Sequence, residues 1–136
     1  MTLLEQLIRD EGVRFFPYTD SVGKLTIGIG RNLTDVGISK DEALQMLTND
    51  VKVATDDLEK ALPWAQGLDE VRHAALVNMT FNMGIGRLCG FTKFLTALEA
   101  GDYKTARNEM LDSQWAKQVG RRAQRLAIQI DSGEFQ

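Results

Sequence analysis

The chain has 136 residues, is 43% hydrophobic and carries a formal net charge of −3 at pH 7. This size suits one cooperative domain over residues 1–136, with room for two lobes, and is too small for two ordinary domains. The longest uncharged run, 74–86, is too short to cross a bilayer, and the single cysteine, Cys89, cannot form an internal disulfide. We therefore expect no membrane anchor, no signal peptide and no dependence on an oxidising compartment.

The first predicted helix begins at a capping box, in which Thr2 and Glu5 satisfy the first free amides, and it ends at Gly12. Glu11 then lies in the last turn, where the helix carbonyls repel an anion and favour the protonated acid in a water-poor cleft. Such an acid suits general acid catalysis. Taken alone, Glu11 is more simply interpreted as a solvated carboxylate beside Asp10. The apolar stripe of this helix consists of Leu3, Leu4, Leu7 and Ile8.

The pattern of residues 13–30 predicts a β-hairpin, and residues 31–34 are expected to form a short third strand. Residues 20–23 fit a type I turn, in which the side chain of Asp20 can simply tie the turn together. In KLTIGIG, apolar residues alternate with others, so a period of two places Thr26 on the face away from the core. Gly28 and Gly30 leave that face bare for a bulky ligand, although strand glycines also mark bulges and bends.

Helices are predicted for the rest of the chain. A second capping box at Ser39 and Glu42 starts a helix that runs to about Ala61 and connects a small β-containing lobe to a helical one. Residues 69–83 are apolar almost all round, which indicates a buried central helix, with Asn78 and Asn82 on one edge. A tight turn is expected at 84–90, and shorter helices at 92–100, 102–111, 114–118 and 121–131.

Charge is unevenly distributed along the sequence. The segment 35–72 contains nine acids and four bases, whereas 114–125 contains Lys117, Arg121, Arg122 and Arg125 and no acid. This basic strip could grip an anionic polymer or could equally be a solvated helix face.

Other chemistries have little support. His73 is the only histidine, which argues against a histidine-rich metal site and against a Cys-His pair with Cys89. Phe81, Phe94 and Trp115 could stack on sugar rings, but aromatic residues at such spacing more often belong to a core.

Several separated motifs nevertheless occur in an order that is typical of one protein family. The sequence resembles the phage T4-type lysozyme family, the endolysins of glycoside hydrolase family 24, over nearly its whole length. The family signature stands here as Glu11, then Asp20 and Thr26 on the hairpin, within the strand TIGIG at 26–30. Further matches are ISKDEA at 38–43, LDEVRHAALVNM at 68–79, FNMG at 81–84, GFT at 90–92, and Trp115 followed by Arg122 and Arg125. The resemblance implies an α+β, mostly helical, lysozyme-like fold with a small N-terminal β-hairpin lobe and a C-terminal helical lobe.

The resemblance also implies hydrolysis of the β-1,4 bond between N-acetylmuramic acid and N-acetylglucosamine in peptidoglycan. Glu11 would protonate the glycosidic oxygen, Asp20 would act as base or charge stabiliser, and Thr26 would hold the attacking water. An oxocarbenium-like transition state needs such a pair of acidic groups. No metal or cofactor is expected.

Three further residues have roles by resemblance. Arg122 matches an arginine that pairs with the catalytic glutamate, Phe81 matches a cleft residue, and Asn32 occupies a cleft position that is commonly leucine. The sequence departs from the family where Phe94 and Glu109 replace small or amide side chains and where Arg31 replaces a frequent histidine. The short connection at 35–38 should reduce the upper lip of the cleft.

The expected biology is that of a monomeric endolysin. Its partner would be peptidoglycan glycan strands, with no nucleic acid and no stable membrane association. It would remain in the host cytoplasm until a holin lesion releases it to the periplasm and cell wall. Two alternatives stay open: a lytic transglycosylase, which uses one acid and no water, and a virion-associated protein that binds or degrades wall glycan.

Overall fold

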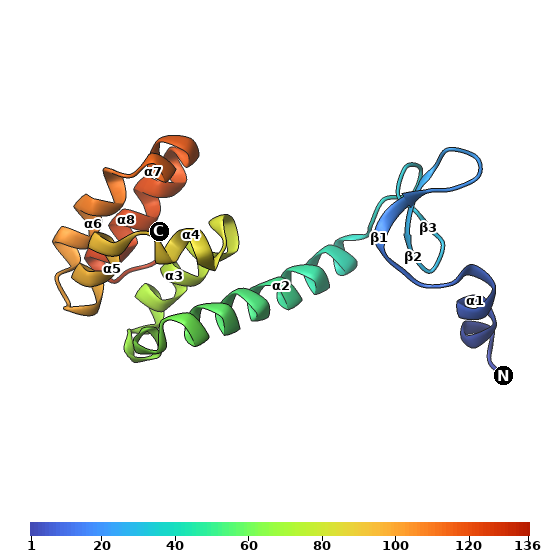
Figure 1. Cartoon of the computed structure of the whole chain (residues 1–136), viewed down its shortest axis with the longest axis horizontal. Coiled ribbons are helices and arrows are strands. Elements are labelled where there is room, and N and C mark those ends of the chain that lie inside the picture. The colour runs from blue at the N-terminus through green and yellow to red at the C-terminus, as the bar shows by residue number, and fades with distance from the viewer. The chain divides into compact units, whose positions relative to one another are not determined.

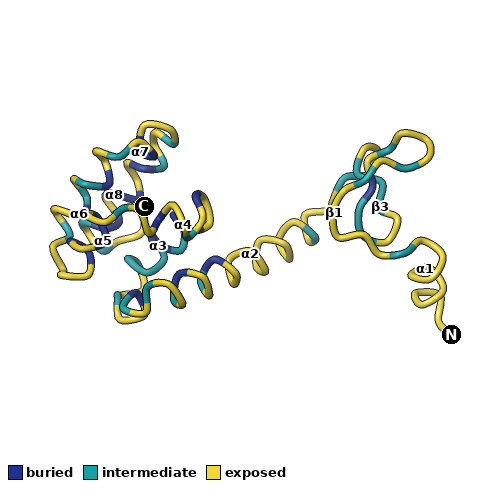
Figure 2. Tube along the Cα trace, viewed as in Figure 1, coloured by how far each residue is buried: buried dark blue, intermediate teal, exposed yellow.

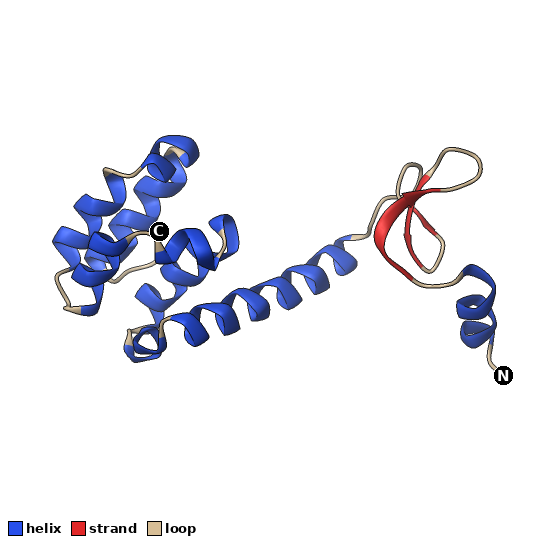
Figure 3. Cartoon of the chain, viewed as in Figure 1, coloured by secondary structure: helices blue, strands red, loops and turns tan.

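The computed structural model describes all of residues 1–136, which form two compact units, Met1–Met46 (unit 1) and Leu47–Gln136 (unit 2). Unit 1 contains a helix, a small sheet and the start of a long helix, and unit 2 is helical (Figures 1 and 3). This α+β, mostly helical architecture confirms the predicted fold class. None of the helices combines the length and the apolar character that a bilayer span requires.

Helix α1 (Leu3–Glu11) begins and ends where the sequence predicts. Thr2 Oγ1 accepts a hydrogen bond from the Glu5 amide at 3.1 Å, and the Glu5 carboxylate accepts one from the Thr2 amide at 2.7 Å. Gly12 follows with a φ of 73°, a backbone conformation that favours glycine. Glu11 is therefore the last residue of the helix. None of the residues of α1 is buried, and its apolar stripe is exposed (Figure 2).

The sheet of unit 1 has the order β1-β2-β3 and is antiparallel throughout. Its strands are β1 (Arg14–Thr19), β2 (Leu25–Gly28) and β3 (Arg31–Asn32). Thr26 on the central strand is opposite Tyr18 of β1 and Asn32 of β3. The hairpin and the short third strand are thus confirmed.

Burial along β2 is the reverse of the sequence prediction. Thr26 is 4% exposed, whereas Leu25 and Ile29 are 44% and 45% exposed. Thr26 has a strand on each side, and its hydroxyl donates to the Lys24 carbonyl at 3.0 Å, so its burial leaves no polar group unpaired. So small a unit has too few residues to cover both faces of its sheet. The outward placement predicted for Thr26 is therefore wrong.

Helix α2 (Lys40–Ala61) starts at the second capping box. Ser39 N donates to Glu42 Oε1 at 2.9 Å, and Ser39 Oγ accepts from Glu42 N at 3.1 Å. The helix ends shortly before Pro63, where the 3-10 helix η1 (Pro63–Gly67) follows. The predicted bounds of this helix are confirmed.

The helices of unit 2 surround a core that contains Phe94 and Trp115, each 2% exposed. They are α3 (Glu70–Met83), α4 (Ile85–Cys89), α5 (Thr92–Glu99), α6 (Tyr103–Leu111), α7 (Gln114–Val119) and α8 (Arg121–Ser132). All but α4 were predicted. The glycine-rich run at 84–90 forms a five-residue helix instead of a simple turn, with Gly84 at a φ of 85° before it.

The polar edge of α3 holds α7 and α8. Asn82 Oδ1 accepts a hydrogen bond from the Trp115 indole at 2.7 Å. Asn78 Oδ1 accepts from Arg122 Nε at 3.0 Å and from Nη2 at 2.7 Å. The two asparagines thus add directional contacts to the apolar packing of this helix.

Arg72 stabilises the C-terminal end of α8. Its Nε donates to the Ile130 carbonyl at 2.6 Å, its Nη2 donates to the Asp131 carbonyl at 3.0 Å, and its guanidinium lies 3.5 Å from the centre of the Tyr103 ring. Nη1 also pairs with Asp69 Oδ1 at 3.1 Å, and Asp69 caps α3. One largely buried cation therefore connects the start of α3 to the end of α8.

We expect Arg72→Met to lower the free energy of unfolding of unit 2 by about 2–4 kcal/mol, because the terminal carbonyls lose charged hydrogen bonds and Tyr103 loses a stacked cation. Lys104→Met, on the exposed side of α6, is the control and should change it by less than about 0.5 kcal/mol. Trp64 and Trp115 both lie in unit 2 and report its unfolding by fluorescence in urea. Equal stabilities of the two variants would contradict this role of Arg72.

Candidate active site

The carboxylate of Glu11 lies against the turn between β2 and β3. A Cβ added to Gly30 would lie 2.8 Å from Glu11 Oε2 and 3.0 Å from Cδ, so a side chain there would displace the carboxylate. Gly30 also has a φ of 72°, which other residues rarely adopt. The last glycine of TIGIG therefore provides both the backbone conformation and the space that Glu11 occupies.

Asp20 and Thr26 are both fixed by the backbone of Lys24. Asp20 Oδ1 accepts hydrogen bonds from Lys24 N at 2.8 Å and from Val22 N at 3.0 Å, while Thr26 Oγ1 donates to Lys24 O at 3.0 Å. The structure thus confirms that Asp20 ties the turn together. Both of these bonds use Oδ1, which leaves Oδ2 for other chemistry. The Thr26 oxygen can still accept a hydrogen bond, since its own proton is directed at Lys24.

Asn32 is opposite Thr26, but its amide is already bonded. Its Nδ2 donates to Asp35 Oδ2 at 3.0 Å, and its Oδ1 accepts from Asp35 N at 3.0 Å. Asp35 in turn pairs with Lys24 Nζ at 3.2 Å. A sugar bound to the Asn32 side chain, as the family resemblance implies, would have to compete with these bonds.

An ion pair between Arg31 and Glu42 connects β3 to the first turn of α2. Arg31 Nη2 lies 2.6 Å from Glu42 Oε2, and Nη1 donates to Glu42 Oε1 at 2.7 Å and to the Gly37 carbonyl at 3.1 Å. The hydrogen bond from Arg31, followed by that from the Ser39 amide, lowers the pKa of Glu42 to about 2. The segment between β3 and α2 is thereby bonded at both of its ends.

A hollow of unit 1 lies along the sheet and the start of α2. It has a volume of ≈ 770 Å³ and is lined by apolar side chains, including Phe15, Ile27 and Ile38, together with Arg14 and Arg31. Glu11, Asp20 and Thr26 are not among its lining residues. It is mainly an apolar groove along the sheet and the start of α2.

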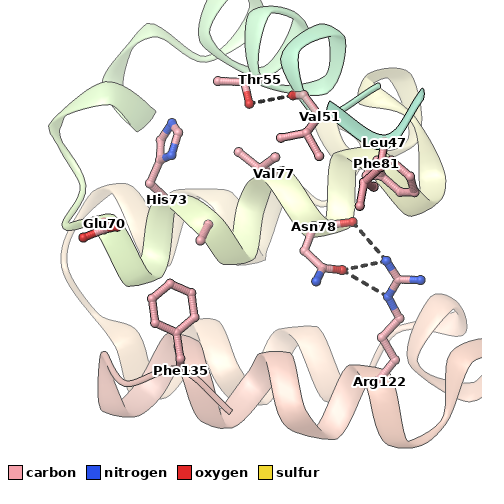
Figure 4. A pocket seen from close by; sticks show the side chains of 11 residues that line it. Leu47, Val51, Thr55, Glu70, His73, Val77, Asn78, Phe81, Arg122 and Phe135 are labelled. Carbon is pink, nitrogen blue, oxygen red and sulfur yellow. Dashed lines mark hydrogen bonds between the residues drawn. The ribbon is translucent and has the colours of Figure 1, made fainter. Parts of the chain in front are cut away.

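The two site residues predicted in unit 2, Phe81 and Arg122, line one hollow of ≈ 510 Å³ (Figure 4). Phe81 is 44% exposed, unlike the buried Phe94 and Trp115, so it alone of the three candidate aromatics offers a large surface to a ligand. Arg122 and Asn78 point toward one another from α8 and α3 (Figure 4). The pairing of Arg122 with Glu11 stays a prediction.

Whether the chain could bind a metal ion depends on its clusters of ligand side chains. No group of three or more histidine, cysteine, aspartate or glutamate side chains is placed to hold a metal ion. His73 Nε2 lies 3.2 Å from Glu59 Oε1, which joins α3 to α2 and agrees with a structural role for the histidine. Cys89 is a free, exposed thiol.

Comparison with known proteins identifies the family. The model of the phage lysozyme family matches residues 9–129, a range that includes all six predicted site residues. The chain belongs to the phage lysozyme family. This confirms the resemblance seen in the sequence.

The relatives of the chain differ in length. The pre-baseplate central spike protein Gp5 of Enterobacteria phage T4 is 31% identical over 100% of the chain, which spans only 28% of that protein. Probable T4-type lysozyme 1 of Dictyostelium discoideum is 26% identical over 97% of the chain and 95% of its own length. The SAR-endolysin of Escherichia phage Mu is 28% identical over 91% of the chain and 76% of its own length.

Two residues that contact the candidate site residues were not identified from the sequence. Asn78 orients Arg122, and the signal was available, because Asn78 is a polar residue on the edge of an apolar helix. Gly30 makes room for Glu11, and its place at the end of TIGIG was seen only as part of a bare face.

The ion pair of Glu42 predicts a specific acid response. Because its pKa is lowered from 4.5 to about 2, the pair stabilises unit 1 fully above about pH 4.5, and this contribution is lost as the pH falls through about 2. Titration of the Glu42 carboxyl carbon by NMR should have its midpoint near 2. In Arg31→Gln the midpoint should rise toward 4.5, and a parent midpoint already near 4.5 would refute the ion pair.

Proposed function

We propose that this protein is a muramidase that hydrolyses the β-1,4 bond between N-acetylmuramic acid and N-acetylglucosamine in bacterial peptidoglycan. The observation that carries the proposal is the arrangement of Glu11, Asp20 and Thr26 in unit 1 of a phage lysozyme family member, at a helix end and along one hairpin. Family membership supplies the class of reaction, and these residues supply the groups that it needs.

Each of the three residues has a defined role in this mechanism. Glu11 donates a proton to the glycosidic oxygen as the bond to the anomeric carbon breaks. A water molecule that donates a hydrogen bond to the Thr26 oxygen attacks that carbon. Asp20 Oδ2 either takes a proton from this water or balances the positive charge of the transition state. The turn that binds Oδ1 fixes the direction of the carboxylate, which preserves its orientation during the reaction.

We further propose an endolysin role, in which the protein accumulates in the host cytoplasm and reaches the periplasm and wall through a holin lesion. The similarity to a SAR-endolysin supports lysis as the biological setting. The similarity to the central spike protein Gp5 supports a location in the virion as the second candidate role. Mass spectrometry of purified phage particles would separate the two, because an endolysin is absent from the particle.

We expect Glu11→Gln to lower the rate of reducing-end release from purified peptidoglycan at least about a hundredfold, since an amide cannot act as the general acid. Asp20→Asn should also be impaired. Full activity of Glu11→Gln would refute the proposed role. The mass of the products distinguishes hydrolysis from transglycosylation, because a transglycosylase leaves an anhydro-muramic end that is lighter by one water.

A pair of glycines tests the position of Glu11. Gly28 and Gly30 have nearly the same φ, 69° and 72°, but a Cβ on Gly28 would meet no atom within 4 Å. Gly28→Ala and Gly30→Ala should therefore share a destabilisation of about 1–2 kcal/mol from backbone strain. Only Gly30→Ala should lose a further tenfold to about a hundredfold in peptidoglycan cleavage, because it moves the acid. Equal rates for the two variants would show that this contact does not position Glu11.

A further inference from the structure

Two long stretches of unit 2 lack acidic residues. No aspartate or glutamate occurs between Glu70 and Glu99, or between Asp112 and Asp131. The first stretch contains α4 and the second contains α7 and the first turns of α8. The acids of unit 2 lie instead on α2, at the start of α3, around α5 and α6, and at the C-terminal end of α8 and beyond it.

A hydrogen bond joins the two acid-free stretches. Arg87 of α4 donates through Nη2 to Gln118 of α7 at 3.4 Å, and Gln118 is next to Lys117 in the chain. Arg121 follows at the start of α8, directly after the sharp turn at Gly120. Arg87, Lys117 and Arg121 are all exposed, and each is either a partner of Gln118 or within three residues of it in the chain; we call these three cations the basic face. Arg125, one turn further along α8, is also exposed.

The cations of the basic face form no salt bridge inside the protein, and Arg87 has only the hydrogen bond to Gln118. Other arginines of unit 2 have internal partners: Arg72 binds helix-end carbonyls, Arg107 pairs with Asp131 at 2.9 Å, and Arg122 binds Asn78. None of the salt bridges involves Arg87, Lys117 or Arg121. On a protein of net charge −3, their grouping leaves a local positive field that is available to a ligand.

The surroundings of the basic face indicate which anion it suits. Ile128 is the only large hydrophobic residue of α4, α7 and α8 that is exposed, whereas binding at a membrane surface requires an apolar face to insert. Trp115, the only aromatic residue of these helices, is buried and cannot stack on nucleobases. Arginines match carboxylates through paired hydrogen bonds. A hydrophilic polymer that carries repeated carboxylates therefore fits best.

We propose that the basic face binds the carboxylate-bearing peptide stems of peptidoglycan and so retains the polymer on the protein. The proposal rests on the proposed muramidase function. It assigns to Arg87, Lys117 and Arg121 a role in retaining substrate, separate from the chemical step. This explains how a chain with net negative charge binds an anionic wall.

The test uses the full chain with Glu11→Gln, so that the wall is not consumed, in sedimentation with purified insoluble peptidoglycan. The triple variant Arg87→Gln/Lys117→Gln/Arg121→Gln should bind about three- to a hundredfold more weakly than this parent at low salt. The matched control, Lys40→Gln/Lys60→Gln/Lys104→Gln, loses the same charge from exposed positions elsewhere and should bind like the parent. Arg87→Lys/Arg121→Lys keeps the charges but loses the paired hydrogen bonds, so its affinity should lie between those of the parent and the triple variant.

Salt and stem removal provide two further readouts. The difference between the triple variant and its control should vanish near 1 M salt, where screening acts within about 3 Å, and on glycan strands from which an amidase has removed the stems. Equal binding of the two triple variants to intact wall at low salt would overturn the proposal. So would a difference that persists without stems, or one found with anionic vesicles or DNA but not with the wall.

Cleavage is measured on the same wall preparation with Glu11 restored. If reducing ends are released but the two triple variants bind equally, the proposed role of the basic face is refuted and the proposed muramidase function is not. Absence of release refutes the proposed function, whatever the binding results.

Discussion

The main chain of Lys24 is the constraint on which the candidate site depends. Its amide binds the Asp20 carboxylate and its carbonyl accepts the Thr26 hydroxyl, so one peptide segment sets the direction of two functional side chains. The Asp20 amide also donates to the Lys24 carbonyl at 2.8 Å, which closes the turn. These contacts are short-range and polar, and they form with the hairpin itself. The site therefore requires the correct turn more than it requires a large core.

The two units are stabilised by different means. Unit 1 buries almost no apolar side chain, and its segments are connected by strand pairing, two capping boxes and the pair between Arg31 and Glu42. Unit 2 has a continuous core around Trp115 and Phe94, to which Arg72 and the asparagines of α3 add directional contacts. Loss of one polar contact should thus matter more in unit 1, whereas unit 2 is more sensitive to cavities.

Local signals predicted most of the architecture correctly. The capping boxes at Thr2 and Ser39, the stop at Gly12 and the turn at Asp20 depend on neighbours in the sequence, and the structure places all of them as predicted. The side of β2 that is covered depends on which strands flank it, which alternation alone does not reveal, and so Thr26 was placed on the wrong face. Helix α4 was missed because glycines usually end helices, whereas Gly86 lies within one. Contacts such as Arg122 with Asn78 join residues far apart in sequence and needed coordinates.

Cys89 offers a single site for chemical labelling. It is the single cysteine of the chain, and its thiol is exposed at the end of α4. A maleimide dye would therefore attach at one defined position without any engineered mutation. Because side chains two residues apart on a helix point to different sides, such a dye would mark α4 without lying over the Arg87 side chain.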